Sequence, residues 1–524
     1  MKKLMYNKMM ERKKIKILDC TIRDGGYYTN WDFDKELIKD YCESMEELPI
    51  DYVEIGYRSI PLEGYLGEYF YCPEYLIKEL KERLPSKKLC IILDEKNIRK
   101  NHIKKLLTPC VPYINMVRMA IDPKNIERAL LLAKEVKKMG FKVAFNVMYM
   151  SKWKEDNTFL DKLKGADSVM DYFYMVDSFG GMLPEDIKET IKLVKSKINV
   201  PLGFHGHNNL EAAFINTLTA MEEGCDIVDA TITGMGRGAG NLRTELLLTY
   251  LESQNLLKIK FSKLSNVVGS FETLKSIYRW GTNLPYMFSG AFSLPQKQVM
   301  EWVGMNRYPI GNIINALNNQ KDSCEDNMKL PVFENESKFK TAIMLGGGKS
   351  AKNHSKAIMK LAESEENICL IHAGARNIHT YLGLKKVDQY CALAGFETEK
   401  LLKSIDDPSL LDHTYVYPPF PREMGTLIPE EIKKGAKELK AIEFTTKSKD
   451  SPMALGFQIA LNLGAKKVLL AGFDGYDITI DQTQFALAQE NQNIINDAVK
   501  CLEVMSITPT KYKKLNTISI YSLV

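Results

Sequence analysis

Residues 15–25 read IKILDCTIRDG, a short apolar run that gives way at Asp19 to polar residues that we expect to form a loop. The same change recurs along the chain at intervals of about 25 to 35 residues, with amphipathic segments between, which is typical of βα units. The predicted strands are 15–18, 52–55, 89–93, 116–119, 143–147, 172–176, 202–205 and 227–231. Eight such units predict a (β/α)₈ TIM barrel, in which active sites lie at the carboxyl ends of the strands.

A second motif, FHGHNN at 204–209, follows the seventh predicted strand. Alternate residues of an extended strand point to the same side, so His205 and His207 face one point. Arg23 and Asp24 of the first motif belong to the same ring of strand ends. Two imidazoles and a carboxylate suit a divalent cation, and a guanidinium can stabilise negative charge on oxygen. The alternative, ordinary loop histidines, is disfavoured because the chain has seven histidines and two meet here.

Polar residues follow the other predicted strands as well. We predict substrate contacts at four of them, Glu54, Arg118, Asp177 and Ser178. After the eighth strand comes GMGRGAGN at 234–241. Glycines at this density let the backbone approach a ligand closely and could set Asn241 against the metal, although a plain tight turn is the alternative.

Composition limits the class of protein. The 524 residues are 45% hydrophobic and carry a formal net charge of +5, which gives no electrostatic case for binding nucleic acid. The ten cysteines are dispersed and contain no C-x-x-C pair, as in proteins of a reducing compartment. No segment resembles a signal-peptide core or a membrane span. We expect a cytoplasmic protein that binds neither nucleic acid nor membrane and forms a homo-oligomer.

The chain beyond the barrel (15–255) divides into two parts. Residues 256–337 predict a helical extension rich in aromatic residues, of which Tyr286 could close the active site. In residues 338–524, strand-like runs alternate with helices again, at 342–345, 368–372, 386–393, 414–417, 441–444 and 467–471. This pattern predicts a Rossmann-like doubly wound α/β domain.

The first of those strands runs into GGGKS at 346–350. A P-loop would need glycine where the chain has Ile343, so that interpretation is rejected. A glycine turn with Gly346 and Gly348, facing Asp474 at another strand end, remains a candidate cofactor-binding site for a phosphate group.

The motifs DCTIRDG, FHGHNN and GMGRGAGN together resemble those of the DRE-TIM metallolyases, a superfamily of metal-dependent aldolases and acyl-lyases, and in particular the 4-hydroxy-2-oxovalerate aldolase branch. The resemblance implies that Asp24, His205 and His207 ligate a divalent cation, with Asn241 as a further ligand. Mn²⁺ or Mg²⁺ is expected, with Zn²⁺ or Co²⁺ as alternatives. Arg23 would stabilise the enolate oxygen of a 2-oxo acid such as pyruvate.

One residue departs from that branch, which has a histidine shortly after the RDG sequence. This chain has GGYY at 25–28, so Tyr27, or Tyr286 in the extension, is the candidate for proton transfer. We therefore expect a metal-dependent aldolase that joins a pyruvate-like acid to an aldehyde. The alternatives are an acetyl-CoA-dependent condensing enzyme with the same metal site, or a binding or scaffold protein that has lost activity.

The C-terminal segment 454–474 resembles part of bacterial sialyltransferase-like and motility-associated glycosyltransferase domains. That resemblance implies a nucleotide-sugar as ligand, and the alternative is a generic helix–strand unit of an α/β sheet. The aldehyde is then expected to be a sugar or a nucleotide-linked sugar.

Overall fold

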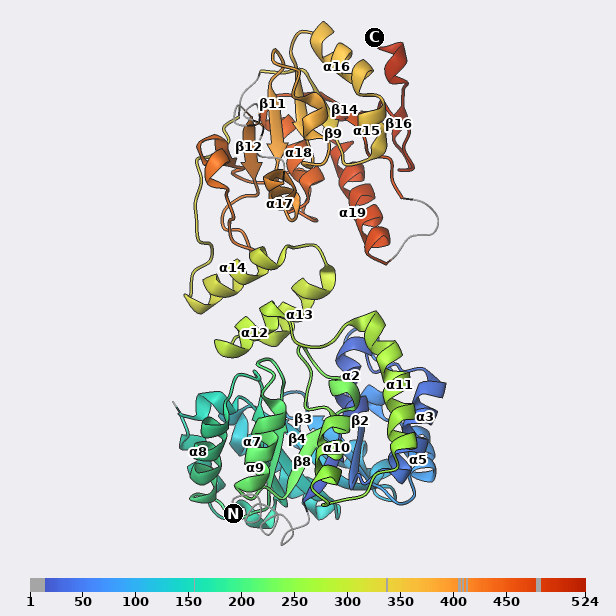
Figure 1. Ribbon diagram of the computed structural model, residues 1–524, viewed down its shortest axis with the longest axis vertical. Helices are drawn as coiled ribbons and strands as arrows, with labels where there is room; N and C mark the ends of the chain where they lie inside the picture. The colour runs from blue at the N-terminus through green and yellow to red at the C-terminus, as the bar shows by residue number, and fades with distance from the viewer. Residues whose placement is uncertain are drawn as a thin grey trace. The chain divides into compact units, whose positions relative to one another are not determined.

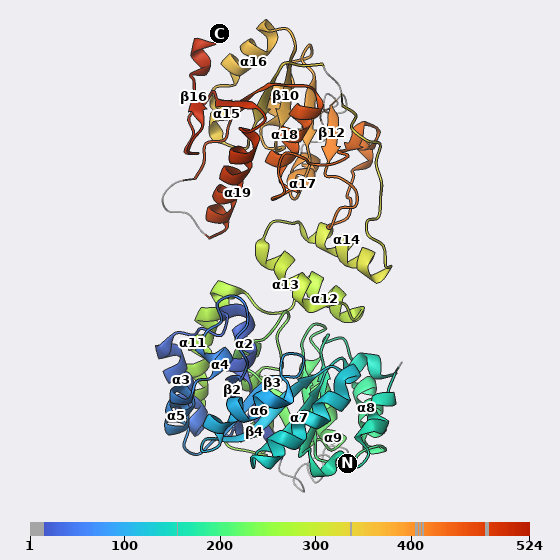
Figure 2. The same cartoon turned by 180° about the vertical axis from the view of Figure 1, so that it is seen from behind.

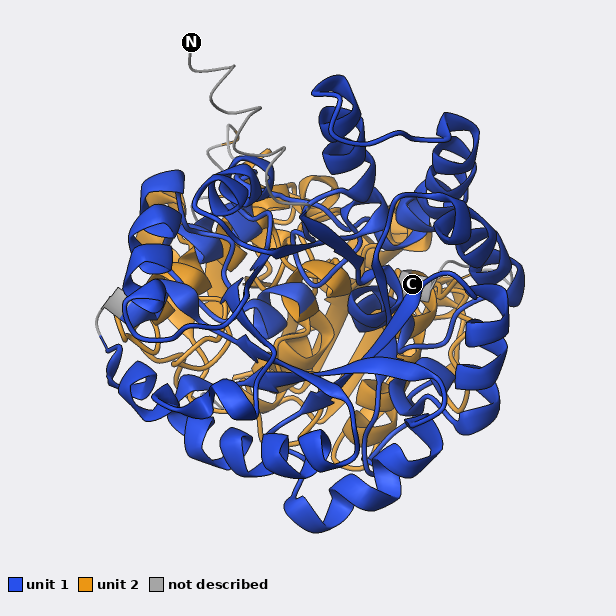
Figure 3. Cartoon of the chain, turned by 90° about the horizontal axis from the view of Figure 1, so that it is seen from below, with its two compact units in different colours: residues 1–300 blue, residues 301–524 orange. Residues whose placement is uncertain are grey.

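The computed structural model describes residues 15–154, 156–335, 338–403, 407, 410, 413–476 and 482–524. It divides into two compact units, residues 1–300 and 301–524 (Figure 3). The expected extension, 256–337, contributes helices to both units. In the described part of the chain, no helix combines the length and the apolar character that crossing a bilayer requires.

The first unit is a closed barrel of eight parallel strands, which confirms the predicted fold (Figure 1). Strand β8 closes the ring by pairing with β1, where Ile17 lies opposite Val228. The strands are β1 Lys16–Asp19, β2 Tyr52–Tyr57, β3 Lys88–Asp94, β4 Ile114–Ile121, β5 Lys142–Val147, β6 Tyr172–Asp177, β7 Leu202–Gly206 and β8 Ile227–Ala230.

Helices surround this ring, and α6 and α7 lie side by side on its outside (Figure 2). Local signals explain where some of them begin; for example, the Asp34 carboxylate accepts hydrogen bonds from the first backbone amides of α3. The helices are α2 Thr21–Thr29, α3 Lys35–Glu47, α4 Glu68–Tyr71, α5 Glu74–Arg83, α6 Lys100–Leu107, α7 Ile126–Lys138, α8 Pro184–Lys195, α9 Ala213–Glu222 and α10 Thr244–Ser253.

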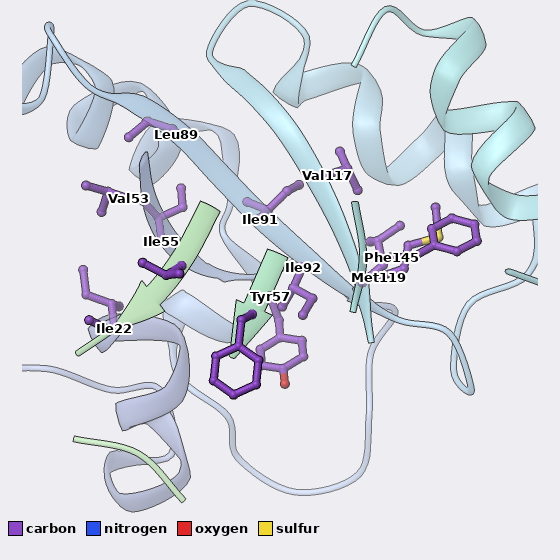
Figure 4. Close-up of a cluster of buried hydrophobic side chains, with 14 of the residues drawn as sticks. Ile22, Val53, Ile55, Tyr57, Leu89, Ile91, Ile92, Val117, Met119 and Phe145 are labelled. Carbon is purple, nitrogen blue, oxygen red and sulfur yellow. The ribbon is translucent and has the colours of Figure 1, made fainter. Parts of the chain in front are cut away.

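The barrel has two apolar layers because side chains alternate along each strand. Outward-facing residues such as Val53, Ile91 and Val117 pack in the layer between strands and helices (Figure 4). Inward-facing residues such as Leu18 and Met116 fill the barrel itself. The interior is therefore packed with side chains, and the polar groups of the site lie at its carboxyl end.

The first motif differs from its prediction. Its RDG segment was expected to form a loop, but residues Thr21–Thr29 form α2. Gly25 and Gly26 serve close packing here, since a Cβ on Gly25 would lie 2.5 Å from Met235 Sδ and one on Gly26 would lie 2.1 Å from Trp31 Cδ1. The loop prediction was wrong because the sequence does not show which side chains pack directly against a glycine.

Four helices follow the barrel: α11 Phe261–Tyr278, α12 Leu284–Ala291, α13 Gln296–Met305 and α14 Ile310–Lys321. Helix α11 packs on α3, and α12 lies directly against the loops after β6 and β7. A Cβ on Gly181 would lie 2.1 Å from Gly290 O, so this approach requires glycine. Helix α12 thus closes over the strand ends that carry the histidines.

The second unit is an eight-stranded parallel sheet in the order β13-β12-β11-β10-β9-β14-β15-β16. Its strands are β9 Thr341–Leu345, β10 Ile368–His372, β11 Gln389–Ala392, β12 Thr414–Tyr417, β13 Ala436–Glu438, β14 Lys467–Ala471, β15 Glu503–Ser506 and β16 Asn516–Thr517. Its helices are α15 Lys349–Asn353, α16 Ser355–Ser364, α17 Glu397–Leu402, α18 Pro452–Asn462 and α19 Gln482–Ala498. The strand order reverses between β9 and β14.

Both faces of this sheet are covered. Met344 of β9 packs in the cluster that includes α18 and α19, while its neighbour Ile343 packs in the cluster that includes α16. The predicted parallel sheet is therefore present, whereas kinship with Rossmann domains stays a prediction. The predicted strand at 441–444 is wrong: the strand there is β13, which ends at Glu438, and Phe444 instead packs against Phe457 of α18.

Candidate active site

The four candidate metal ligands lie together at the carboxyl end of the barrel. His205 Nε2 is 3.5 Å from Asp24 Oδ2, and the ring centres of His205 and His207 are 4.9 Å apart. Asn241 Nδ2 donates a hydrogen bond to Asp24 Oδ2 at 2.6 Å. All four side chains are buried. Three elements far apart in sequence, α2, β7 and the loop after β8, meet at this point.

The charges suit a cation. Arg23 pairs with Asp24 and donates through Nε to Glu54 Oε2 at 2.7 Å. Burial alone would raise the pKa of Asp24, but Arg23 and the two histidines outweigh it and lower that pKa to about 2. Burial, with His205, lowers the pKa of His207 to about 3. An ionised carboxylate and a neutral imidazole are the forms that bind metal.

The histidines are oriented from behind. His205 Nδ1 lies 2.8 Å from Asp229 Oδ2, and His207 Nδ1 lies 2.8 Å from the backbone oxygen of Asp177. With Nδ1 engaged, Nε2 of each ring remains for a cation, and such outer partners are usual at metal-binding histidines. Asp229 was not predicted from the sequence. The feature of the sequence that could have identified it is a carboxylate within an otherwise apolar strand.

The unpaired atoms also fit a bound cation. Asn241 Oδ1 is buried and has no hydrogen-bond partner in the described part of the chain. Together with Asp24 and the two histidines, it completes a mixed nitrogen and oxygen set suited to a divalent metal. Cys20 Sγ lies in the same cluster of ligand atoms as Asp24 and His205. Burial raises the pKa of that thiol well above its usual value, so it is a poorer ligand.

Two of the predicted substrate-binding residues lie beneath the site. The Arg118 guanidinium donates to Asn146 Oδ1 at 3.0 Å and Glu54 Oε2 at 3.1 Å, and it pairs with Asp229. Its side chain is fully buried, with Cζ 4.3 Å from the centre of the Tyr174 ring. In this arrangement Arg118 and Glu54 position other site residues, so contact with substrate through them stays a prediction without support from the geometry.

The other two predicted substrate-binding residues hold the turn after β6. Ser178 Oγ accepts a hydrogen bond from Tyr149 N at 2.8 Å, and Met182 N donates to Asp177 Oδ2 at 3.3 Å. Burial raises the pKa of Asp177 to about 6, although hydrogen bonds from the backbone amides of this turn oppose the rise. A role of Asp177 and Ser178 in substrate binding stays a prediction.

Tyrosines surround the site in place of the histidine that the aldolase branch carries. Tyr27 Oη is 3.1 Å from Tyr57 Oη, and Tyr28 Oη donates to Gly238 O at 2.9 Å. Tyr286, on α12, is buried, and burial raises its pKa to about 12. Burial therefore keeps Tyr286 protonated, which disfavours it as a general base.

Comparisons with known proteins identify relatives of the barrel. Residues 106–269 match the family described as HMGL-like. A 4-hydroxy-2-oxovalerate aldolase from Carboxydothermus hydrogenoformans is 32% identical over 46% of this chain and 71% of its own length. An oxaloacetate decarboxylase from Mycobacterium tuberculosis is 26% identical over 46% of this chain and 71% of its own length.

A solved structure matches as well. It is the N-terminal domain of a Bacteroides vulgatus protein described as an aldolase, 53% identical, with a TM-score of 0.55 over 58% of this chain and all of the other. The chain belongs to the HMGL-like family. As an HMGL-like protein it is an enzyme of the metal-dependent aldolase and lyase class, and the family implies a divalent metal.

The HMGL-like match lies in the first unit, and a separate cleft lies in the second. This cleft has a volume of about 990 Å³ and opens where the strand order reverses. Of the predicted cofactor-binding residues, Gly348 and Asp474 line it. A Cβ on Gly348 would lie 2.6 Å from Asp474, so glycine is required. The third, Gly346, packs behind, where its carbonyl accepts a hydrogen bond from Asn377.

Proposed function

We propose that the barrel forms or cleaves a carbon–carbon bond between a pyruvate-like 2-oxo acid and an aldehyde. The observation that carries this proposal is the buried guanidinium of Arg23, held beside Asp24 within the cluster of His205, His207 and Asn241. The named relatives act on 4-hydroxy-2-oxovalerate and oxaloacetate, both 2-oxo acids. When the carbon–carbon bond next to the carbonyl group of a 2-oxo acid forms or breaks, the acid passes through an enolate. Positive charge beside the enolate oxygen stabilises it.

The residues that would hold the metal are Asp24, His205, His207 and Asn241, and Mn²⁺ or Mg²⁺ is the proposed ion, with Zn²⁺ or Co²⁺ as alternatives. A bound divalent cation supplies Lewis-acid activation of the 2-oxo acid.

Arg23 supplies the second positive charge. Its Nε is fixed by Glu54, and Glu54 is fixed in turn by Arg118. The guanidinium is therefore oriented before substrate arrives and can stabilise an enolate oxygen without reorganisation. Arg23 itself is 7% exposed, so little water competes for this interaction.

Proton transfer is assigned to Tyr27. As the phenolate, Tyr27 would accept the proton that leaves the hydroxyl group of the substrate during cleavage, and as the phenol it would return that proton during addition. Its Oη lies 3.1 Å from Tyr57 Oη, and this hydrogen bond would hold the ring in place. Tyr27 is half-buried in α2, the helix that carries Arg23 and Asp24. Tyr27→Phe should slow turnover more than it weakens substrate binding.

Release of pyruvate from a 4-hydroxy-2-oxo acid tests the proposal, with lactate dehydrogenase and NADH as the detector. We expect release that depends on Mn²⁺ or Mg²⁺, stops with EDTA and is lost in Asp24→Asn. Oxaloacetate in the same assay detects decarboxylation.

Two other results would replace the proposal. Free thiol released from acetyl-CoA in the presence of a 2-oxo acid would establish the condensing enzyme. A folded, metal-bound protein inactive in every arm would favour the binding or scaffold protein.

For the second unit we propose binding of a phosphate-bearing ligand such as a nucleotide-sugar, which makes a sugar or nucleotide-linked sugar a candidate for the aldehyde. Its cleft is lined by Lys349 and Arg376 beside the glycine turn, with Phe396 and Tyr512 as surfaces on which a base could stack. Calorimetry with UDP-glucose tests this, and Lys349→Glu should weaken binding at least about 10-fold. Binding that Lys349→Glu does not weaken would contradict this site.

A further inference from the structure

The loop after β8 is shaped to present one side chain, that of Arg237. Two glycines of the loop, Gly236 and Gly240, have no room for a Cβ. On Gly236 it would lie 2.5 Å from Asn241 Nδ2, and on Gly240, where φ is +80°, it would lie 2.1 Å from Gly234 O. Gly238 also has a positive φ, +66°. The backbone conformation therefore allows few alternatives, and Arg237 is the long polar side chain between those glycines.

The loop is also tied to its surroundings directly after Arg237. Tyr28 Oη donates to Gly238 O at 2.9 Å, Gly238 N donates to Met300 Sδ at 3.1 Å, and Asn208 N donates to Gly240 O at 2.8 Å. Because the loop is held from α2, α13 and the segment after β7, the backbone position of Arg237 relative to the candidate metal ligands is well defined.

The Arg237 guanidinium lies beside the Tyr27 ring. It is half-buried, with Cζ 5.4 Å from the centre of the Tyr27 ring. Arg23 and Arg118 each pair with two carboxylates. No ion pair involves Arg237 among the residues that the structure describes. A partly desolvated guanidinium is suited to a carboxylate or phosphate from a ligand.

We propose that Arg237 binds an anionic group, a carboxylate or a phosphate, on the aldehyde partner, so that the enzyme is selective for anionic aldehydes. The inference rests on the proposed aldolase function. The 2-oxo acid would have other positive charges to bind. These are Arg23 and the cation that the candidate ligands would hold, which lie together deeper in the barrel. Tyr27, the proposed proton carrier, has Arg237 over its ring, which places the guanidinium on the side where the aldehyde would react.

The test compares matched aldehydes in Mn²⁺-dependent addition of pyruvate, with kcat/KM measured for each. Succinic semialdehyde is compared with butyraldehyde, and glyceraldehyde 3-phosphate with glyceraldehyde. We expect the anionic member of at least one pair to be preferred by about 10- to 100-fold, and the pair that shows the preference identifies carboxylate or phosphate. Arg237→Gln should lower that ratio at least about 10-fold, chiefly through KM, and Arg237→Lys should restore part of it.

Arg243→Gln is the matched control. It removes the same charge from an arginine that is exposed at the end of the same loop. Turnover of neutral aldehydes with no preference for either anion, or a preference that survives Arg237→Gln, would overturn this inference and leave the proposed function standing. Lack of turnover with all four aldehydes would overturn both.

Discussion

At the scale of single residues, the site is a chain of alternating charges. Arg23 joins Asp24 to Glu54, and Arg118 joins Glu54 to Asp229. Two guanidinium groups and three carboxylates leave this buried group with one formal negative charge in excess. Buried charges are stable only when compensated, so this excess of negative charge favours the binding of a cation beside Asp24.

Asp229 is expected to act through His205 as a positioning residue. Asp229→Asn should weaken Mn²⁺ binding about 10- to 100-fold, because the amide no longer fixes the imidazole or balances Arg118. Isothermal titration calorimetry measures the dissociation constant. Asp167→Asn, at an exposed aspartate of the same unit, is the control, and equal affinity of the two variants would exclude the positioning role.

His372, in the second unit, predicts a dependence of stability on pH. Burial, and to a lesser degree His413, lowers the pKa of His372 to about 4 from a usual value of 6.5. As the pH falls below 6.5, the unfolded chain gains a proton at this imidazole and the folded chain does not. The free energy of unfolding therefore falls, by about 2 kcal/mol at pH 5.

His372→Gln should remove this contribution. The stability difference between wild type and variant is measured by urea unfolding at pH 7 and at pH 5. It should shift by about 2 kcal/mol in favour of the variant at the lower pH. A difference that stays constant between the two values would show that His372 titrates normally.

How much the sequence predicts also depends on scale. Asp24, His205 and His207 could be placed together because the carboxyl ends of all strands of a parallel barrel lie at the same rim. The role of Asp229 could not be predicted from the sequence, since its contacts with His205 and Arg118 cross the barrel interior. The roles proposed for Arg118 and Glu54 show the same difficulty, because sequence locates a strand end and does not say how deep a side chain lies.

At the scale of elements, short apolar runs that recur between amphipathic segments located the barrel strands, whereas glycine was harder to interpret. Gly25 and Gly26 indicated a loop and occur inside α2, where close packing requires them. The short strand β13 was missed because its AKE sequence has no apolar run, and the apolar stretch after it was taken for the strand.

The glycine loop gives a prediction at this scale. Gly240→Ala should abolish turnover and lower the free energy of unfolding by about 1 to 3 kcal/mol, because a Cβ would overlap Gly234 O at a positive φ. Gly269→Ala is the control: this residue lies within α11 with no atom near the added Cβ, so stability should rise by about 0.5 to 1 kcal/mol. Turnover that survives Gly240→Ala would show that the loop is not essential.

At the scale of the whole molecule, the chain combines an HMGL-like barrel with a second α/β unit. The solved domain from Bacteroides vulgatus covers 58% of this chain, which corresponds to the first unit. A fragment of residues 1–305, which includes all of α13, should therefore unfold cooperatively and bind Mn²⁺ with the affinity of the full chain. Calorimetry and circular dichroism measure both. A fragment that aggregates or loses the metal would show that the barrel depends on the second unit.

The most direct test of the central claim, that this barrel generates an enolate from a 2-oxo acid, is proton NMR of pyruvate in D₂O with the enzyme. We predict that the methyl signal decays by exchange with Mn²⁺ or Mg²⁺ present, that EDTA stops the decay, and that Arg23→Ala slows it at least about 100-fold. A stable methyl signal with metal bound at Asp24, His205 and His207 would contradict the account.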